Sequence, residues 1–258
     1  MDLNLIKNTA VGAAYKSGEI LRSHLGNFGE VSKKGPKDLV TAADIASEKQ
    51  IIKSIQSRFA DHKILAEESS AQNTGTDGHT WIIDPLDGTT NFAHQVPVFS
   101  VSIAFAENGQ LRAGVVLNPM TGELFTAVQG QGAQLNGRAI SVSDCRQVSE
   151  SLLVTGFPYD IKENPGPYMD KFARCLSAAI GVRRLGSAAL DLCFVACGRF
   201  EGFWEQGLKP WDTAAGTLIA REAGARVTDF SGTAYDIDKK ELLATNGHIH
   251  EDLRSLLT

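Results

Sequence analysis

Two carboxylates, Asp84 and Asp87, stand three residues apart at the end of a short apolar segment. Pro85 between them holds its φ angle at about −65°, and Gly88 after them tolerates backbone angles that other residues avoid. A chain that bends here can aim both side chains and the Leu86 carbonyl at one point. Oxygen ligands of this kind suit Mg²⁺ or Mn²⁺ rather than zinc. The same pattern also fits an ordinary turn whose aspartates accept local hydrogen bonds, so these residues alone leave both interpretations open.

The turn after these carboxylates has features of an anion site. The backbone N–H groups of Gly88 and Thr89 can face a bound anion, and a helix that starts nearby would add its positive end. Two further acidic residues stand in suggestive places, since Glu67 follows an apolar stretch and Asp212 opens a helical one. Taken singly, each is more typical of a helix cap or a solvated charge.

Hydrophobic periodicity predicts the elements that must position these groups. In the first half of the chain it predicts a helix near the N-terminus and a second helix over residues 41–59, for which Thr41 could be the N-cap. The Lys- and Gly-rich stretch 32–38 predicts a loop, because Gly35-Pro36 breaks regular structure. Strands are expected at residues 81–83, 99–105, 111–117 and 123–128, with a hairpin turn at Asn108-Gly109.

The second half of the chain repeats the alternation of helices and strands. Strands are expected at residues 151–155, 202–205, 225–228 and 242–244, and helices at 168–179, 188–197 and 211–223. Gly224 is expected to end the last of these helices. Mixed helices and strands with several hairpins predict a layered α+β or α/β architecture rather than a doubly wound Rossmann sheet.

Composition argues against several classes of protein. The 258 residues carry 25 Lys and Arg against 30 Asp and Glu, a formal net charge of −5, which disfavours direct and general nucleic-acid binding. No apolar run reaches about 18 residues, so no membrane contact through a spanning helix is expected. The first residues lack the pattern of a signal peptide, so the expected location is the cytoplasm. The four cysteines lack the spacing of a zinc site. His248 and His250 are interpreted as an exposed helix start rather than as metal ligands.

Five motifs in order resemble those of one enzyme family. Residues 81–94 (WIIDPLDGTTNFAH) and 211–225 (WDTAAGTLIAREAGA) resemble the two signature motifs of inositol monophosphatase-like sugar phosphatases. Further matches are residues 38–44 (DLVTAAD), 67–69 (EES) and 186–190 (GSAAL). The resemblance spans about residues 5 to 250. It is strongest to bacterial inositol-1-monophosphatases, through residues 130–137 (GQGAQLNG) and 207–211 (GLKPW).

The resemblance implies a site for two or three Mg²⁺ ions, with Mn²⁺ as an alternative. Asp84 would bridge two ions. Glu67 and the Leu86 carbonyl would complete the first site, and Asp87 and Asp212 would complete the second. A third, weaker ion near Glu67 would hold the attacking water, so Glu67 counts among the expected catalytic residues.

The resemblance also implies residues for catalysis and substrate binding. Asp44 and Thr89 would orient and deprotonate the attacking water, and the N–H groups of Gly88 and Thr89 would bind phosphate oxygens. Glu205 would accept hydrogen bonds from substrate hydroxyls, and Lys33 falls on a lysine of a mobile loop, although Lys34 could take that role. The other residues expected around the substrate are Leu86, Asp87, Asp212, Gly186, Ser187 and Ala188.

The implied fold is a layered αβαβα sandwich of the α+β class, as in inositol monophosphatase and fructose-1,6-bisphosphatase. It would form a single domain over residues 1–258, with an N-terminal half at about 1–145 and a C-terminal half at about 146–258. Four carboxylates would repel one another without metal, so the site is expected to form poorly without it, and activity is expected to fall in acid.

The implied activity is Mg²⁺-dependent hydrolysis of a small sugar or polyol phosphate by direct attack of water, with myo-inositol monophosphate as the expected substrate. Fructose-1,6-bisphosphate, histidinol phosphate, 3′-phosphoadenosine 5′-phosphate and NADP stay open as alternatives. The resemblance further implies a homodimer and inhibition by lithium. A second reading is interaction with the transcription machinery, which some bacterial relatives bind.

Overall fold

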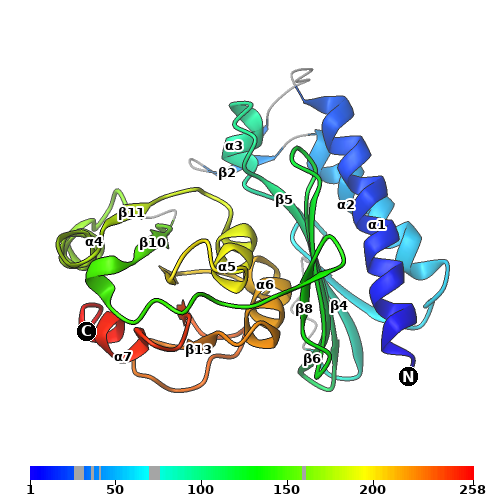
Figure 1. The fold of residues 1–258 in the computed structure, drawn as a ribbon. Coiled ribbons are helices and arrows are strands. Elements are labelled where there is room, and N and C mark those ends of the chain that lie inside the picture. The colour runs from blue at the N-terminus through cyan, green and yellow to red at the C-terminus, as the bar shows by residue number, and fades with distance from the viewer. Residues whose placement is uncertain (26–31, 36–37, 41, 70–75, 159–160) are drawn as a thin grey trace.

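Helices and β-sheets alternate in five layers (Figure 1) across the described part of this computed structural model, which comprises residues 1–25, 32–35, 38–40, 42–69, 76–158 and 161–258. Only the backbone is described for residues 32–35 and 38–40. Helices α1 (Leu3–His24) and α2 (Ala42–Gln56) form one outer layer. Between the two sheets lie α5 (Ala188–Ala196) and α6 (Pro210–Glu222), and beyond the second sheet lie α4 (Gly166–Ala178) and α7 (His250–Ser255). The predicted αβαβα sandwich is therefore confirmed.

Each sheet has a distinct topology among the described residues. The larger sheet has the order β3-β4-β5-β6-β7-β8-β9 and is antiparallel except at the β3–β4 pair. Its strands are β3 (Lys63–Ala66), β4 (His79–Asp87), β5 (Ser100–Glu107), β6 (Gln110–Asn118), β7 (Glu123–Val128), β8 (Ala133–Leu135) and β9 (Arg138–Ile140). The smaller sheet has the order β11-β10-β12-β14-β13, with β10 parallel to both of its neighbours. Its strands are β10 (Leu152–Thr155), β11 (Gly181–Arg183), β12 (Gly202–Gln206), β13 (Arg226–Thr228) and β14 (Glu241–Thr245).

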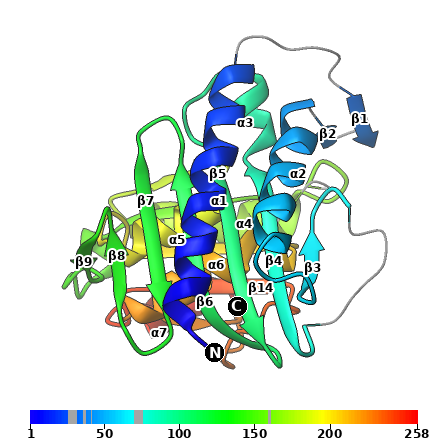
Figure 2. The same ribbon diagram turned by 90° about the vertical axis from the view of Figure 1, so that its right-hand side faces the viewer.

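Side chains of β4 alternate between two cores, as the two-residue period of a strand requires. Trp81 and Ile83 belong to the core under α1 and α2, whereas Ile82 belongs to the core around α5 and α6. Figure 2 shows α1 and α2 lying across the outer face of the larger sheet. Burial on both faces therefore holds β4 firmly, and this strand carries Asp84 and Asp87 at its end.

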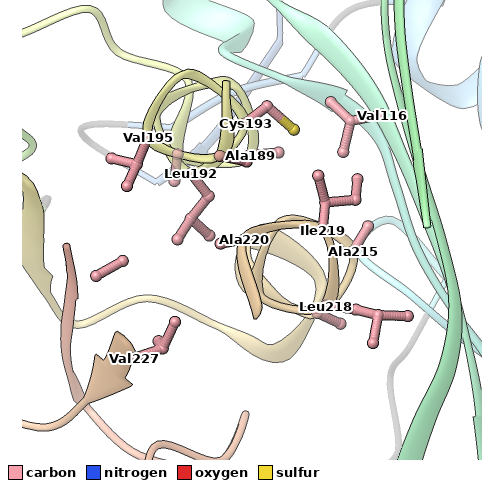
Figure 3. Packing of buried hydrophobic residues seen from close by; sticks show 14 of the residues in the cluster. Val116, Ala189, Leu192, Cys193, Val195, Ala215, Leu218, Ile219, Ala220 and Val227 are labelled. Carbon is pink, nitrogen blue, oxygen red and sulfur yellow. The ribbon is translucent and has the colours of Figure 1, made fainter. Parts of the chain in front are cut away.

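Small residues let α6 approach the larger sheet closely. A Cβ on Gly114 of β6 would lie 2.9 Å from the carbonyl oxygen of Ala215, so a larger residue there would push α6 away. In Figure 3, Ala215 and Ile219 of α6 lie on the side of the helix nearest the sheet, below Val116. This contact holds in place the helix whose first turn contains Asp212.

One prediction about the backbone is wrong, and one strand is longer than predicted. The stretch 32–38, predicted as a loop, contains β1 (Ser32–Gly35) and the start of β2 (Asp38–Val40), which pair antiparallel and so satisfy each other's backbone groups. The strand predicted over 81–83 continues to Asp87, because a bulge lets β4 resume its pairing with β5 at Ser100. Thr41, the predicted N-cap of α2, lies outside the described residues.

The described helices include none that is long and apolar enough to span a membrane.

His250 is buried, so its interpretation as part of an exposed helix start is wrong. It does begin α7, but its side chain lies between two threonines: Nε2 is 2.9 Å from Thr228 Oγ1, and Nδ1 is 2.8 Å from Thr245 Oγ1. Burial lowers the pKa of His250 to about 4, so the ring is neutral at pH 7. Both partners belong to strands β13 and β14, and local sequence spacing cannot show that they meet α7.

Candidate functional site

The end of β4 bends at a bulge that opens between Asp84 and Asp87. Inside the bulge, the N–H of Leu86 donates a hydrogen bond of 3.0 Å to Asp84 Oδ1. Gly88 follows with a φ of 97°, in the left-handed region, and a Cβ on it would lie 3.0 Å from the carbonyl oxygen of Gly186. Only glycine suits both conditions. Helix α3 (Thr89–Ala93) begins immediately afterwards.

Asp87 is held by the beginning of α5. Its Oδ1 accepts from the N–H of Ala188 at 3.2 Å, and its Oδ2 accepts from the N–H of Ala189 at 3.0 Å. The hydroxyls of Ser187 (2.5 Å) and Ser100 (3.2 Å) donate to Oδ2 as well. Burial raises the pKa of Asp87, and these hydrogen bonds oppose the rise. Residues that the resemblance assigned to the sugar pocket therefore also anchor a predicted metal ligand.

Asp212 stands in the first turn of α6, which begins at Pro210. Its Oδ2 accepts a 2.7 Å hydrogen bond from the N–H of Lys209, so the side chain caps the helix that carries it. Burial raises the pKa of Asp212 well above its usual value, and repulsion by Asp87 and Glu67 adds to the rise. The structure thus brings Asp212 to the acidic residues of β4.

Asp84 lies at the centre of an acidic cluster. Glu67 follows β3, and its N–H donates to the carbonyl of Ile83 at 3.2 Å, which places it beside Asp84 on the neighbouring strand. Burial raises the pKa of Asp84 well above its usual value, and repulsion by other acidic side chains adds to it. These repelling side chains are Glu67, Asp87, Asp212 and Asp44. Asp84 is only 2% exposed and Asp44, on α2, only 1%. Glu67 and Asp212 are half-buried, so the cluster is buried at its centre and reaches solvent at its edge.

The donor chemistry of this cluster fits a hard divalent cation. Every candidate ligand is an oxygen, which suits Mg²⁺ or Mn²⁺. Burying several carboxylates together is unfavourable unless a positive charge compensates them. Within the described ranges, no three His, Cys, Asp or Glu side chains stand in a ready-made chelating arrangement.

A pocket of about 130 Å³ opens beside this cluster. Asp87 and Asp212 line it on the side of the carboxylates, and Arg184 lines it from the segment before α5. The residues that the resemblance assigned to phosphate and sugar binding line the same pocket, and these are Gly88, Thr89, Gly186, Ser187, Ala188 and Glu205. The structure therefore brings these six predicted substrate residues and two of the predicted metal ligands to one cavity.

Glu205 is set in the pocket by its contact with Gly156, the residue after β10. A Cβ on Gly156 would lie 2.1 Å from Glu205 Oε2, so only glycine leaves room for this carboxyl group. Burial raises the pKa of Glu205 to about 8, with repulsion by Asp212 as a further cause. At pH 7 the group is mostly protonated and can both donate and accept hydrogen bonds.

Comparison with known proteins assigns the chain to a family. The family model described as "Inositol monophosphatase family" matches residues 2–258. The chain belongs to the inositol monophosphatase family. The resemblance inferred from its motifs is therefore confirmed, and the chain is a phosphatase, and so a hydrolase, of this family.

Relatives match the chain over most or all of its length. The inositol-1-monophosphatase of Rhizobium meliloti (strain 1021) is 40% identical over 260 residues, which cover 100% of this chain and 97% of that protein. The Nus factor SuhB of Escherichia coli (strain K12) is 46% identical over 228 residues, 87% of this chain and 85% of that protein. The structure of inositol monophosphatase from Anabaena (Nostoc) sp. PCC 7120 matches with a TM-score of 0.91 at 44% identity, covering 100% of this chain and 96% of that one.

The predicted site also includes Thr89 and one of two lysines, Lys33 or Lys34. Thr89 Oγ1 donates to the Leu86 carbonyl oxygen at 3.1 Å, and a carbonyl oxygen keeps a second lone pair for another partner. Lys33 lies in β1, but its side chain lies outside the described residues, as does that of Lys34. The roles expected for these residues in the inositol monophosphatase family stay predictions.

Several residues of the pocket and its surroundings were not predicted from the sequence. Gly156 and Phe157 line the pocket, and Ser100 and Ala189 donate hydrogen bonds to Asp87. One available signal was position, since residues 156–157 directly follow a predicted strand, and sites in α/β sheets gather beyond the carboxyl ends of parallel strands. Ser100 carried no such signal, because its partner becomes apparent only through the register of β4 with β5.

Proposed function

We propose that this chain is a Mg²⁺-dependent phosphatase that hydrolyses a small phosphate monoester, with myo-inositol monophosphate as its substrate. One observation carries the proposal: five acidic residues, Asp84, Asp87, Asp212, Glu67 and Asp44, lie together beside a pocket that Asp87 and Asp212 line. Such an arrangement is poorly suited to a protein that binds no cation.

Asp84, Asp87, Asp212 and Glu67, with the Leu86 carbonyl, would hold the divalent ions. When bound, two such ions lower the pKa of water and compensate the charge on the attacking and leaving oxygens. The four hydrogen bonds that Asp87 accepts fix its carboxylate in advance, so fewer orientations would be lost when it binds an ion. The hydrogen bond from Lys209 does the same for Asp212.

The phosphate would lie against the start of α3. The N–H groups of Gly88 and Thr89 would donate to its oxygens, and both residues line the pocket. Asp44 and Thr89 would orient the attacking water. Because the Thr89 hydroxyl donates its own proton to the Leu86 carbonyl, Thr89 Oγ1 would accept a hydrogen bond from one O–H of that water. Asp44 would take up the proton of the other O–H as the water attacks.

The pocket supports a polyol as the leaving group. Glu205 presents a mostly protonated carboxyl group, which can pair with a hydroxyl in either sense. A cationic group such as the ammonium of histidinol phosphate would gain less from a neutral partner. Fructose-1,6-bisphosphate, 3′-phosphoadenosine 5′-phosphate and NADP stay as competing substrates.

The test is phosphate release from these substrates with and without Mg²⁺. We expect the highest kcat/KM for myo-inositol 1-phosphate, loss of activity with a chelator, and inhibition by lithium. Activity that persists in excess chelator would contradict the metal-dependent mechanism. A higher kcat/KM for another phosphate would retain the mechanism and replace the substrate.

A second function is favoured by one comparison, the 46% identity to the Nus factor SuhB of E. coli. We propose a protein contact with the transcription machinery, because the net charge of −5 disfavours direct nucleic-acid binding. We further propose that the chain forms a homodimer in the cytoplasm. Asp87→Asn separates the two functions: a variant that loses phosphatase activity but retains binding to RNA polymerase would show that the contact is independent of catalysis.

A further inference from the structure

A buried chain of hydroxyl groups connects α1 and α2 to the bend of β4. Ser47 Oγ donates to the carbonyl oxygen of Pro85 at 2.8 Å, and Ser17 Oγ lies 2.5 Å from Ser47 Oγ. Both serines are 0% exposed. A serine hydroxyl has one proton, and that of Ser47 goes to the carbonyl, which can only accept. Ser17 must therefore donate to Ser47, and the chain runs from α1 through α2 to β4.

The Pro85 carbonyl needs this partner because neighbouring strands do not pair with it. The register of β4 with β3 ends at Ile83, and its register with β5 is interrupted between Asp84 and Asp87. Pro85 is itself buried inside this interruption. A buried carbonyl without a hydrogen bond is unfavourable, so Ser47 takes the place that a neighbouring strand would otherwise fill.

This hydrogen bond acts on the Asp84 side chain through one rigid peptide unit. The carbonyl of Pro85 and the N–H of Leu86 belong to the same planar group. Ser47 holds the carbonyl end at 2.8 Å, and the N–H end donates to Asp84 Oδ1 at 3.0 Å. Rotation of this peptide would break both bonds. The orientation of the central carboxylate therefore depends on a serine of another helix.

Helix α2 holds a second segment of the cluster in a similar way. Glu48, next to Ser47, accepts a 2.8 Å hydrogen bond from the N–H of Glu68, the neighbour of Glu67. Asp44 stands one turn earlier on the same helix. Helix α2 thus contacts both acidic segments of the larger sheet, and α1 supports it at Ser17.

We propose that Ser47, oriented by Ser17, is a positioning residue for the divalent-cation site. It holds the Pro85–Leu86 peptide, and through it the Asp84 carboxylate, in the orientation that binds the ion. This inference rests on the proposed function, because it takes Asp84 to be a ligand. The two serines themselves touch neither ion nor substrate.

The experiment is calorimetric titration of the full chain with Mn²⁺, for the wild type and Ser47→Ala. We expect Ser47→Ala to bind Mn²⁺ about tenfold more weakly, as is common when a partner of a metal ligand is removed. Ser17→Ala keeps the bond to Pro85 and should weaken binding about threefold, the equivalent of a weak net hydrogen bond. The Mn²⁺ concentration for half-maximal phosphatase activity should rise in the same order, with little change in rate at saturation.

A matched control is Ser54→Ala, which removes a half-buried hydroxyl of α2 that accepts from Gln50 at 3.1 Å. Its Mn²⁺ affinity should equal that of the wild type. A folded Ser47→Ala protein with unchanged Mn²⁺ affinity would overturn this inference and leave the proposed function standing. Failure of the wild type to bind Mn²⁺ would overturn both. If Ser47→Ala does not fold, unchanged affinity in Ser17→Ala overturns the inference instead.

Discussion

Replacing Gly156 by alanine should displace the Glu205 carboxyl group from the substrate pocket. The new Cβ would lie 2.1 Å from Oε2 and 2.2 Å from both Cδ and Oε1 of Glu205, far inside contact distance. The obstructed atoms are the end of a flexible side chain rather than backbone. Glu205 should therefore rotate away while the fold persists, and the effect should fall on substrate recognition rather than on stability.

The size of the effect is that of one hydrogen bond between Glu205 and a substrate hydroxyl. Glu205 lines the pocket, and the Gly156→Ala variant would lose this bond. Such a bond has a net value of about 0.5–1.5 kcal/mol, which corresponds to about 2- to 13-fold in an equilibrium constant. We expect kcat/KM for myo-inositol 1-phosphate to fall by about fivefold at pH 7.

The assay is phosphate release under saturating Mg²⁺, with Gly12→Ala as the matched control. A Cβ on Gly12 would meet nothing within 4 Å, so this variant should retain wild-type kcat/KM. In a Glu205→Ala background, Gly156→Ala should add almost nothing, because both changes act through one carboxyl group. An unchanged kcat/KM in Gly156→Ala, or an equal loss in both backgrounds, would refute the reasoning.

Gly114→Ala should lower the free energy of unfolding by about 1–3 kcal/mol in a denaturant titration, because its Cβ would lie 2.9 Å from the backbone of α6; an unchanged midpoint would contradict the packing described. Acid should destabilise the protein through His250, whose folded pKa of about 4 lies below its unfolded value of about 6.5. As the pH falls, the unfolded state therefore binds the proton at a higher pH than the folded state does. The free energy of unfolding is highest above pH 6.5 and falls toward pH 4 by up to about 1.4 kcal/mol per pH unit. His250→Gln should flatten this loss, and an identical profile would exclude the histidine as its cause. Mg²⁺ should raise the Tm of the wild type more than that of Asp212→Asn, and an equal rise would place the ion elsewhere.

Local sequence patterns were sufficient for the elements that carry the site. The apolar run before Asp84 and the stretch after Asp212 both predicted the correct element type. A short continuous apolar run fits a strand buried on both faces, and a stretch of about 10 residues or more fits a helix. The motifs around them led to the family and its five-layer fold. The short strands β8 and β11 were missed, although β13, of the same length, was predicted.

Contacts between distant segments could not be predicted from spacing. The bond of Ser47 to Pro85 joins residues 38 positions apart, and that of Ser187 to Asp87 joins residues 100 apart. Gly156 gave no sign of its contact with Glu205, because that contact depends on β10 lying beside β12. Such residues become apparent only once the order of strands in each sheet is known.

The cation site is tested most directly by counting the Mn²⁺ ions bound by the wild type and by Asp84→Asn in equilibrium dialysis. We predict that the wild type binds about two ions, as in other two-metal phosphatase sites. Asp84→Asn should lose tight binding of both ions, because Asp84 would bridge them. A wild-type protein that binds no Mn²⁺, or an Asp84→Asn protein that binds the same number with the same affinity, would contradict it.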